Sequence, residues 1–203
     1  MEVQQLEEVG IIGGREKRDV EIHEYDERWP MFYEQNASRI RKVLGNIALR
    51  IEHIGSTSVP GLSAKPIIDI LVVMATPGDE ASYLPALEEA GYELRVREPE
   101  FDEHRMVRTP EKNVHVHIFP PWSKETGRYL AFRNQLRANA EDRAAYEQAK
   151  RTLAKRKWGD MNDYAEAKSD VVEAIIAKGI LAFGKDADKR DCDKRATNGT
   201  ATI

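Results

Sequence analysis

The chain has 203 residues, 41% of them hydrophobic and 33% charged, which is enough for one soluble domain with a packed core. Its net charge of −4 argues against a nucleic-acid partner, and its single cysteine, Cys192, excludes an intrachain disulfide and a cysteine zinc site. The N-terminus lacks a signal-peptide pattern and no apolar run approaches the roughly 20 residues that span a membrane, so we expect a cytoplasmic protein without membrane association, with a homo-oligomer left open.

The charge pattern divides the chain into three parts. Residues 1–19 alternate in charge around Ile11 and Ile12 and predict a flexible N-terminal arm. Residues 20–184 predict a single domain. Residues 185–203 combine mixed charge with a polar end that lacks apolar periodicity, and this composition predicts a disordered tail.

The predicted domain opens with a short strand and a helix. Residues 20–24 alternate in polarity, as a strand does. Asp26 can cap a helix over residues 27–44, which Gly45 ends. One face of this helix carries Tyr33, Ala37, Ile40 and Leu44.

A polar loop then joins two apolar runs. The runs cover residues 48–54 and 67–74 and predict two strands. The loop begins with Gly55, Ser56, Thr57 and Ser58. A loop rich in glycine and hydroxyl groups can turn its backbone N–H groups toward an anion, although ordinary turn chemistry uses the same residues. The pattern therefore predicts a phosphate-binding loop, with a plain turn as the alternative.

The second apolar run contains one charge, Asp69. A carboxylate among Ile, Leu and Val side chains is costly unless it is hydrogen-bonded, paired or bound to a cation. Asp69 is therefore either a ligand of a divalent cation, Mg²⁺ or Mn²⁺, or an acceptor of hydrogen bonds from the loop. Lys65 closes the loop and can offset the charge of a bound phosphate.

A helix over residues 79–90 and a strand over residues 92–97 are predicted next, separated by Gly91. Residues 104–109 and 114–119 then predict an antiparallel hairpin with a four-residue loop.

Strand alternation assigns the faces of this hairpin. If the loop is residues 110–113, Arg108 lies opposite His115 and Met106 lies opposite His117. His104, Arg108, His115 and His117 would then share one face, although a slip of one residue in one strand would reverse this. The His-x-His spacing suits two metal ligands, with polar residues on an exposed strand face as the alternative, and Arg108 is a candidate phosphate partner.

The C-terminal half is predicted to be helical over residues 124–139, 141–158 and 163–181. The middle helix carries a basic run that includes Lys150, for which a solvated helix face is favoured over a phosphate-binding patch. The pattern as a whole predicts an α+β fold: a twisted mixed or antiparallel sheet of about five strands with packed helices.

The string HIGSTSVPGLSAKPIIDILV closely resembles the signature of the GrpB family. The segments VEIHEYDERWPMFYEQNASRIRKVLG, HVHIF and YLAFRNQLRAN are also similar to that family, so the resemblance covers roughly residues 20–179. It implies a nucleotidyltransferase-like sheet, because the family is placed in that superfamily.

The superfamily pattern is an apolar residue followed by Gly-Ser, and then Asp, an apolar residue, and Asp or Glu. Ile54-Gly55-Ser56 and Asp69-Ile70 match this pattern, but Leu71 stands where the second carboxylate belongs. Two-metal chemistry needs several carboxylates. A second one would have to come from elsewhere, for example Asp102 or Glu103.

Two functions from different classes follow. The first is phosphoryl or nucleotidyl transfer, in which the Gly55–Ser58 loop and Arg108 hold phosphates, Asp69 and Lys65 act in catalysis, and Asp69 with His115 or His117 holds the cation. The second is a binding module for a nucleotide or another phosphorylated small molecule, and the resemblance makes a coenzyme A precursor a candidate ligand, since some relatives are fused to a dephospho-coenzyme A kinase. A metal-dependent hydrolase built on the two histidines ranks third.

Overall fold

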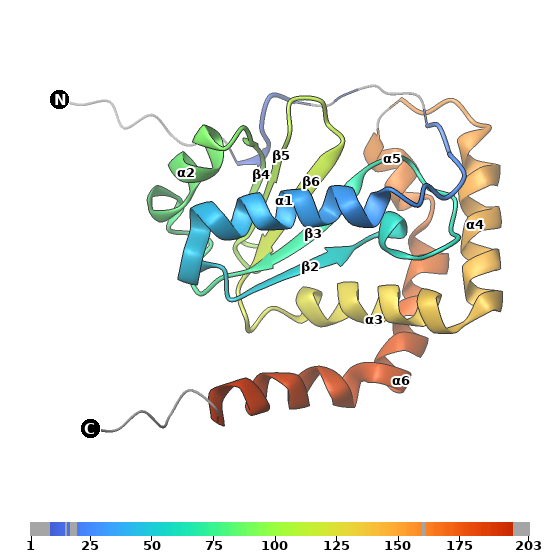
Figure 1. The fold of residues 1–203 in the computed structure, drawn as a ribbon. Helices are drawn as coiled ribbons and strands as arrows, with labels where there is room; N and C mark the ends of the chain where they lie inside the picture. The colour runs from blue at the N-terminus through green and yellow to red at the C-terminus, as the bar shows by residue number, and fades with distance from the viewer. Residues whose placement is uncertain (1–8, 15, 17–19, 160, 197–203) are drawn as a thin grey trace.

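In the computed structural model, residues 9–14, 16, 20–159 and 161–196 are described, and they form a mixed sheet with helices on both faces (Figure 1). The sheet has six strands in the order β1-β4-β5-β6-β3-β2. Among the strands of the described residues, only β3 and β6 pair in parallel. The strands are β1 Gly10–Ile11, β2 Arg50–Ile54, β3 Ile68–Val73, β4 Glu93–Glu98, β5 His104–Arg108 and β6 Val114–Phe119. The predicted α+β class and mixed sheet are confirmed, with six strands instead of five.

The helices are α1 Trp29–Leu44, α2 Leu84–Glu89, α3 Lys124–Ala138, α4 Ala140–Ala154, α5 Met161–Glu166 and α6 Ser169–Ala196. Short 3-10 turns cover Gly45–Ile47, Ser56–Ser58 and Glu80–Ser82. The helical C-terminal half is therefore confirmed. Within the described residues, no helix is both long enough and apolar enough to cross a membrane.

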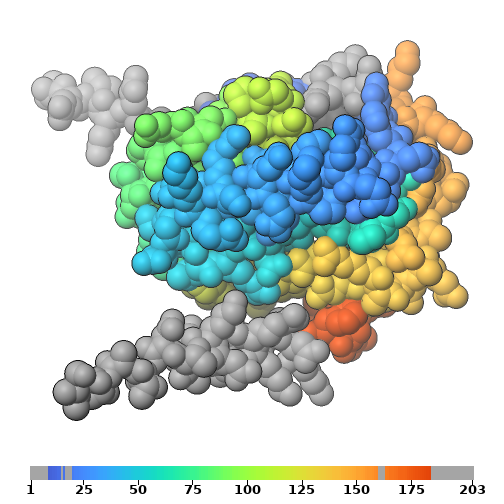
Figure 2. All heavy atoms as spheres, viewed as in Figure 1, coloured from blue at the N-terminus to red at the C-terminus, as the bar shows by residue number. Residues whose placement is uncertain are grey.

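Alternation along β3 and β6 separates two cores. Ile68, Ile70 and Val72 point with Val114, Val116 and Ile118 toward α1 and α2, where they meet Trp29, Ile40, Leu44 and Leu87. On the other face, Leu71, Val73 and Phe119 pack against Leu130 of α3. Figure 2 shows α1 as a ridge across the first face, with α3 below it. The odd-numbered positions of β3 and β6 therefore face the helical C-terminal half.

The hairpin has the predicted register. Arg108 lies opposite His115, and Met106 lies opposite His117. β6 also pairs with β3, which sets Asp69 opposite His115 and Leu71 opposite His117. One face of the sheet thus carries Asp69 together with both histidines.

The predicted chain ends differ from those observed. β1 lies within residues 1–19, which were predicted to be a flexible arm. This strand has no apolar pattern of its own, and backbone hydrogen bonds to β4 hold it at the edge of the sheet. Ile12 N–H donates to the Arg95 carbonyl over 2.9 Å, and the Arg95 guanidinium donates to the Gly14 carbonyl over 2.7 Å. α6 continues past residue 184 into the predicted tail, whose Ala, Lys and Arg residues are good helix formers. The rest of residues 1–19 and residues 197–203 lie outside the described residues.

Two predicted elements are shorter or divided. Residues 20–24 form only an isolated bridge between His23 and Ala64. The helix predicted over residues 79–90 is divided into a 3-10 turn and α2. Pro85 lies in the first turn of α2, where its missing N–H group is tolerated, so it favours a helix start at this point.

The helix predicted over residues 163–181 is also divided. α5 ends at Glu166 and α6 begins at Ser169, so a turn at Ala167 and Lys168 separates them. Ser169 and Asp170 at the start of α6 are residues typical of a helix N-terminus.

Gly179 allows α3 and α6 to touch. A Cβ at this position would lie 2.7 Å from the carbonyl carbon and 3.2 Å from the Cα of Ala131. Because the contact is with backbone, Gly179→Ala is expected to lower the free energy of unfolding by about 1–3 kcal/mol, the usual cost of overpacking. Chemical denaturation would measure this loss.

Gly127 of α3 is the matched control, because no atom lies within 4 Å of a Cβ built there. Gly127→Ala should be neutral or stabilising by up to about 1 kcal/mol, as helix propensity predicts. Equal effects of the two substitutions would contradict the close packing of α3 on α6.

Candidate functional site

A cavity of about 170 Å³ lies between the Gly55 loop, the first residues of β3 and β6, and the helical half. It is lined by Gly55, Ser56, Lys65, Ile67, Asp69, His115, Tyr146, Lys150, Tyr164 and Lys168. The lining thus combines residues from the loop and strands with residues of α4, α5 and the α5–α6 turn. Five of the residues singled out from the sequence meet here: Gly55, Ser56, Lys65, Asp69 and His115.

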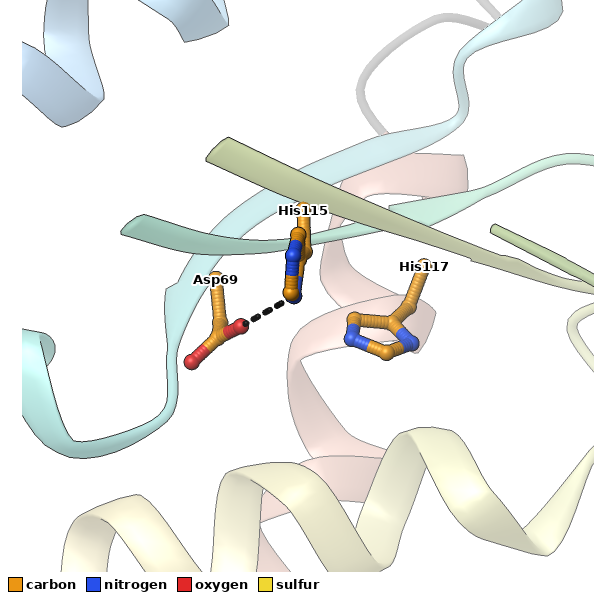
Figure 3. A group of neighbouring side chains, drawn as sticks. All are labelled: Asp69, His115 and His117. Carbon is orange, nitrogen blue, oxygen red and sulfur yellow. Dashed lines mark ion pairs between the residues drawn. The ribbon is translucent and has the colours of Figure 1, made fainter. Parts of the chain in front are cut away.

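One carboxylate and two imidazoles converge, and the carboxylate and one of the imidazoles line this cavity. Asp69 of β3 and His115 of β6 lie opposite each other, with 3.6 Å between Asp69 Oδ1 and His115 Nδ1. His117 lies two residues further along β6 on the same side, and Figure 3 shows its ring turned toward the other two side chains. Asp69, His115 and His117 each offer a ligand atom, and these three atoms lie within 4.8 Å of one another.

A chain of hydrogen bonds from Glu98 through His104 orients the His117 ring. His104 Nδ1 lies 2.8 Å from the Glu98 carboxylate, and His104 Nε2 lies 3.2 Å from His117 Nδ1. If His104 donates to the carboxylate, its Nε2 must accept, so His117 donates from Nδ1. This leaves the Nε2 lone pair of His117 on the side of Asp69 and His115. A histidine that binds a metal commonly donates its other N–H in this way.

Burial sets the protonation of the cluster. It raises the pKa of the Asp69 carboxyl to about 6, against the opposing attraction of Lys65 and Lys168. Burial, with repulsion from His104 and His115, holds the pKa of His117 well below its usual range. A neutral imidazole is the form that binds metal ions. The Asp69 side chain is still 28% exposed, so an ion can reach it.

The four residues predicted as a phosphate loop divide into two pairs. Gly55 and Ser56 line the cavity, and the Ser56 hydroxyl donates to the Tyr146 hydroxyl over 3.5 Å. Thr57 and Ser58 are buried, and their hydroxyls bind backbone carbonyls in and beside the loop. Thr57 Oγ1 donates to the Ile67 carbonyl over 2.9 Å, and Ser58 Oγ donates to the Gly55 carbonyl over 2.6 Å. Their hydroxyls therefore hold the shape of the loop.

Gly55 lies directly against Asp69. Its φ of 68° and ψ of −173° fall in a region that is essentially restricted to glycine. A Cβ at this position would lie 2.9 Å from both the Cβ and the Cγ of Asp69. The absence of a side chain at residue 55 thus leaves the space that the Asp69 carboxyl occupies.

Three lysines also line the cavity. Lys150 is only 3% exposed, and its ammonium group donates to the Ser63 carbonyl and lies 4.7 Å from the centre of the Tyr146 ring. The ammonium groups of Lys65 and Lys168 lie 5.2 Å and 4.6 Å from the centre of the Tyr164 ring. Burial and the repulsion of Lys168 lower the pKa of Lys150 to about 7. The solvated face predicted for the basic run therefore does not describe Lys150.

Arg108 is held outside this cavity by carboxylates. Its guanidinium binds Glu16 over 2.8 Å and 3.0 Å and Glu93 over 2.8 Å. These ion pairs lower the pKa of Glu16 to about 2, with Lys112 as a further partner. Arg108 shares a sheet face with His115, as predicted. Its guanidinium, however, is paired with Glu16 of the N-terminal segment.

Leu71 is fully buried against Ile54, Phe119 and Leu130, so the second carboxylate position of the superfamily pattern is part of the core. Asp102 accepts a hydrogen bond from Ser123, and the Glu103 carboxylate accepts one from the Gly78 N–H. Neither is part of the described cluster.

The sequence analysis did not identify Glu98, Tyr146, Tyr164 and Lys168. It placed His104 on the face of His117 without giving it a role, and it favoured a solvated face for Lys150. Their signal in the sequence is weak, because charged and tyrosine residues on helices usually face solvent or core.

Sequence and structure comparisons show which known proteins this chain is similar to. A family model described as GrpB protein matches residues 19–178. A UPF0157 protein of Streptomyces coelicolor is 53% identical over 167 residues, covering 82% of this chain and 88% of that protein. The crystal structure of conserved protein GrpB from Enterococcus faecalis has a TM-score of 0.73 and 33% identity, covering 80% of this chain and 99% of that one. Part of a dephospho-CoA kinase of Mycolicibacterium paratuberculosis is 26% identical over 169 residues, covering 70% of this chain and 42% of that kinase.

Proposed function

Because the chain belongs to the GrpB family over a span that includes the whole cavity, we propose that it binds a phosphorylated small molecule of the nucleotide class together with a divalent cation. The observation that carries this proposal is the convergence of Asp69, His115 and His117 within 4.8 Å. An array of one carboxylate and two imidazoles beside several lysines suits a cation and the phosphate that it neutralises.

The donor set favours Mn²⁺ over Mg²⁺. Mg²⁺ prefers oxygen ligands in near-octahedral geometry, whereas imidazole ligands suit later divalent ions of the first transition row. The Glu98–His104–His117 chain supports the assignment, because it presents a lone pair of His117 to the shared position.

The reaction that fits these groups is phosphoryl or nucleotidyl transfer. A bound cation would polarise the phosphate and orient the attacking group. Asp69, His115 and His117 would hold that cation, and Gly55 and Ser56 would position a phosphate through backbone and hydroxyl groups. Lys65 would stabilise negative charge that develops on the phosphate oxygens.

Non-catalytic binding is the second candidate. The partial match to a dephospho-CoA kinase favours a coenzyme A precursor as the ligand. The buried Leu71 favours binding without turnover, because two-metal transfer needs further carboxylates.

His115→Gln tests the metal site. It should weaken Mn²⁺ binding, measured by isothermal titration calorimetry, by about 10–100-fold or more, because one ligand atom is lost. The control is His23→Gln, since His23 is an exposed histidine that does not line the cavity. Mn²⁺ binding of equal strength in both variants would contradict the site.

Turnover separates the two candidates. Protein with Mn²⁺ is incubated with nucleoside triphosphates, and release of pyrophosphate or phosphate is followed. Release that His115→Gln abolishes would support transfer. Tight binding of dephospho-coenzyme A without release would support the binding module.

A further inference from the structure

Glu16 of the N-terminal segment fills an anion-binding position on the sheet. Both terminal nitrogens of the Arg108 guanidinium donate to its carboxylate, over 2.8 Å and 3.0 Å. The Lys112 ammonium group lies 3.0 Å from the same carboxylate, and the Arg95 guanidinium lies 3.8 Å from it. A guanidinium that presents two parallel N–H groups binds a phosphate in the same way as a carboxylate. The position therefore suits a phosphate group as well as Glu16.

The sheet itself orients the Arg108 guanidinium. Its Nε donates over 2.8 Å to the carboxylate of Glu93, which lies opposite Arg108 on β4. The Arg108 side chain is only 10% exposed. One edge of the guanidinium is thus held by the neighbouring strand, and the other edge is presented to the anion.

Arg108 lies in line with the candidate metal site. Asp69 is opposite His115, and His115 is opposite Arg108, so the three residues form one row across β3, β6 and β5. Residues opposite each other on neighbouring strands project to the same face of a sheet. Two strand spacings separate the Asp69 and Arg108 backbones, which is roughly 10 Å. This distance is within the length of a nucleoside diphosphate.

The segment that carries Glu16 has a short attachment to the sheet. β1 pairs with β4 over two residues, and the Arg95 guanidinium donates to the Gly14 carbonyl over 2.7 Å. Gly13 and Gly14 both have positive φ angles. Glycine regains more conformational freedom on release than any other residue, and short edge segments open at a much lower free energy than the whole domain.

From these contacts we propose that Glu16 is an internal competitor for a phosphate group of the ligand. The ligand phosphate takes the place of the carboxylate at Arg108, and the segment that carries Glu16 then leaves the sheet. This inference rests on the proposed function in taking the ligand as phosphorylated, but it does not depend on a metal. The competitor lowers the apparent ligand affinity in proportion to the fraction of molecules in which the position is open.

The first test measures binding of inorganic phosphate to the full chain by isothermal titration calorimetry in EDTA. Glu16→Gln should bind phosphate about tenfold more tightly than the wild type, because a neutral amide competes poorly for a guanidinium. Combining it with Arg108→Gln should remove the gain. Glu93→Gln is the matched control, since it removes a charge from the same guanidinium while its amide oxygen still accepts from Nε. Because the Glu93 side chain is 46% exposed, its charge contributes little, and the gain should be far smaller.

The second test follows release of the segment by limited proteolysis. Trypsin cleaves after Arg15 and Lys17, which flank Glu16 in the sequence. When opening is fast relative to cleavage, the cleavage rate follows the open population. Saturating phosphate should accelerate cleavage at these two positions in the wild type by about tenfold. Without phosphate, Glu16→Gln should be cleaved faster than the wild type, and Glu93→Gln should be cleaved like it.

The outcomes separate this inference from the proposed function, because EDTA removes the cation. Unchanged phosphate affinity in Glu16→Gln would overturn the competitor, and so would a gain of equal size in Glu93→Gln, which net charge alone explains. A gain that persists when Arg108 is also replaced, or cleavage that phosphate does not accelerate, would overturn it as well. Mn²⁺ binding that His115→Gln leaves unchanged would instead overturn the metal site and leave the competitor standing.

Discussion

Asp69→Asn is expected to abolish the rise in Tm that Mn²⁺ produces in the wild type. At a free metal concentration 100 times Kd, binding stabilises the folded state by about 2.7 kcal/mol, or roughly 5–10 °C for a domain of this size. The amide that replaces the carboxylate is neutral and a poorer ligand, and it sits between Gly55 and His115. Differential scanning fluorimetry with and without Mn²⁺ measures the effect.

The metal-free proteins should also differ, in a pH-dependent way. The pKa of Asp69 is about 6 in the folded protein against an ordinary value of 3.8, so the folded state holds the proton more tightly than the unfolded state. The Asp69 contribution to stability therefore falls as the pH rises from about 4 to about 6. Above this window Asp69→Asn should be more stable than the wild type by on the order of 2–3 kcal/mol, and below it the difference should vanish.

Glu89→Gln is the control, because Glu89 is an exposed carboxylate on α2, on the other face of the sheet. It should keep the Mn²⁺ response and the pH profile of the wild type. An equal Mn²⁺ response in Asp69→Asn, with a loss of about 1–3 kcal/mol in its metal-free form, would mean that Asp69 braces the loop through hydrogen bonds. The superfamily resemblance would then describe the ancestry of the fold and not a working site.

Gly55→Ala is expected to lower the free energy of unfolding by about 3–5 kcal/mol, the range in which large single-residue effects fall. Two costs combine: a backbone conformation that is essentially restricted to glycine, and a methyl group placed against the Asp69 side chain. Relief would require the carboxyl to leave its present position beside His115 and His117, so Mn²⁺ affinity should fall as well. Urea denaturation and calorimetry would report the two effects separately.

Gly61→Ala separates the two costs. Gly61 also has a positive φ, of 74°, but no atom lies within 4 Å of a Cβ built there. It should lose only about 1–2 kcal/mol, the cost of the left-handed backbone, and keep its Mn²⁺ affinity. If the two variants lose equal stability and both bind Mn²⁺ normally, the contact between Gly55 and Asp69 does not define the site.

Local patterns in the sequence determined the central strands and the hairpin. Alternation of apolar and polar residues in β6 is enough to place His115 and His117 on one side, because successive side chains of a strand point to opposite faces. The four-residue loop fixed which residues of β5 lie opposite them. The position of Asp69 within an apolar run identified it as unusual, since an unpaired buried charge is costly.

The parallel pairing of β3 with β6 was decided only by the tertiary structure. It joins segments far apart in the sequence, and no local pattern specifies which strands become neighbours. This pairing sets Asp69 beside His115 and Leu71 beside His117. The edge strand β1 was also not predictable, because its stability comes from backbone hydrogen bonds and from Arg95.

The positions of the cavity lysines likewise depend on packing. Lys150 resembles its solvated neighbours in the basic run, and only the position of α4 against the Ser63 segment buries it. Lys168 reaches the cavity because a turn divides α5 from α6 at that residue. Sequence alone therefore identified the Gly55–Ser58 loop, Asp69 and the two histidines as separate candidates, because strand periodicity describes one segment at a time. The fold decided which of them share a cavity and which charges face them, since burial and charge proximity arise only when distant segments meet.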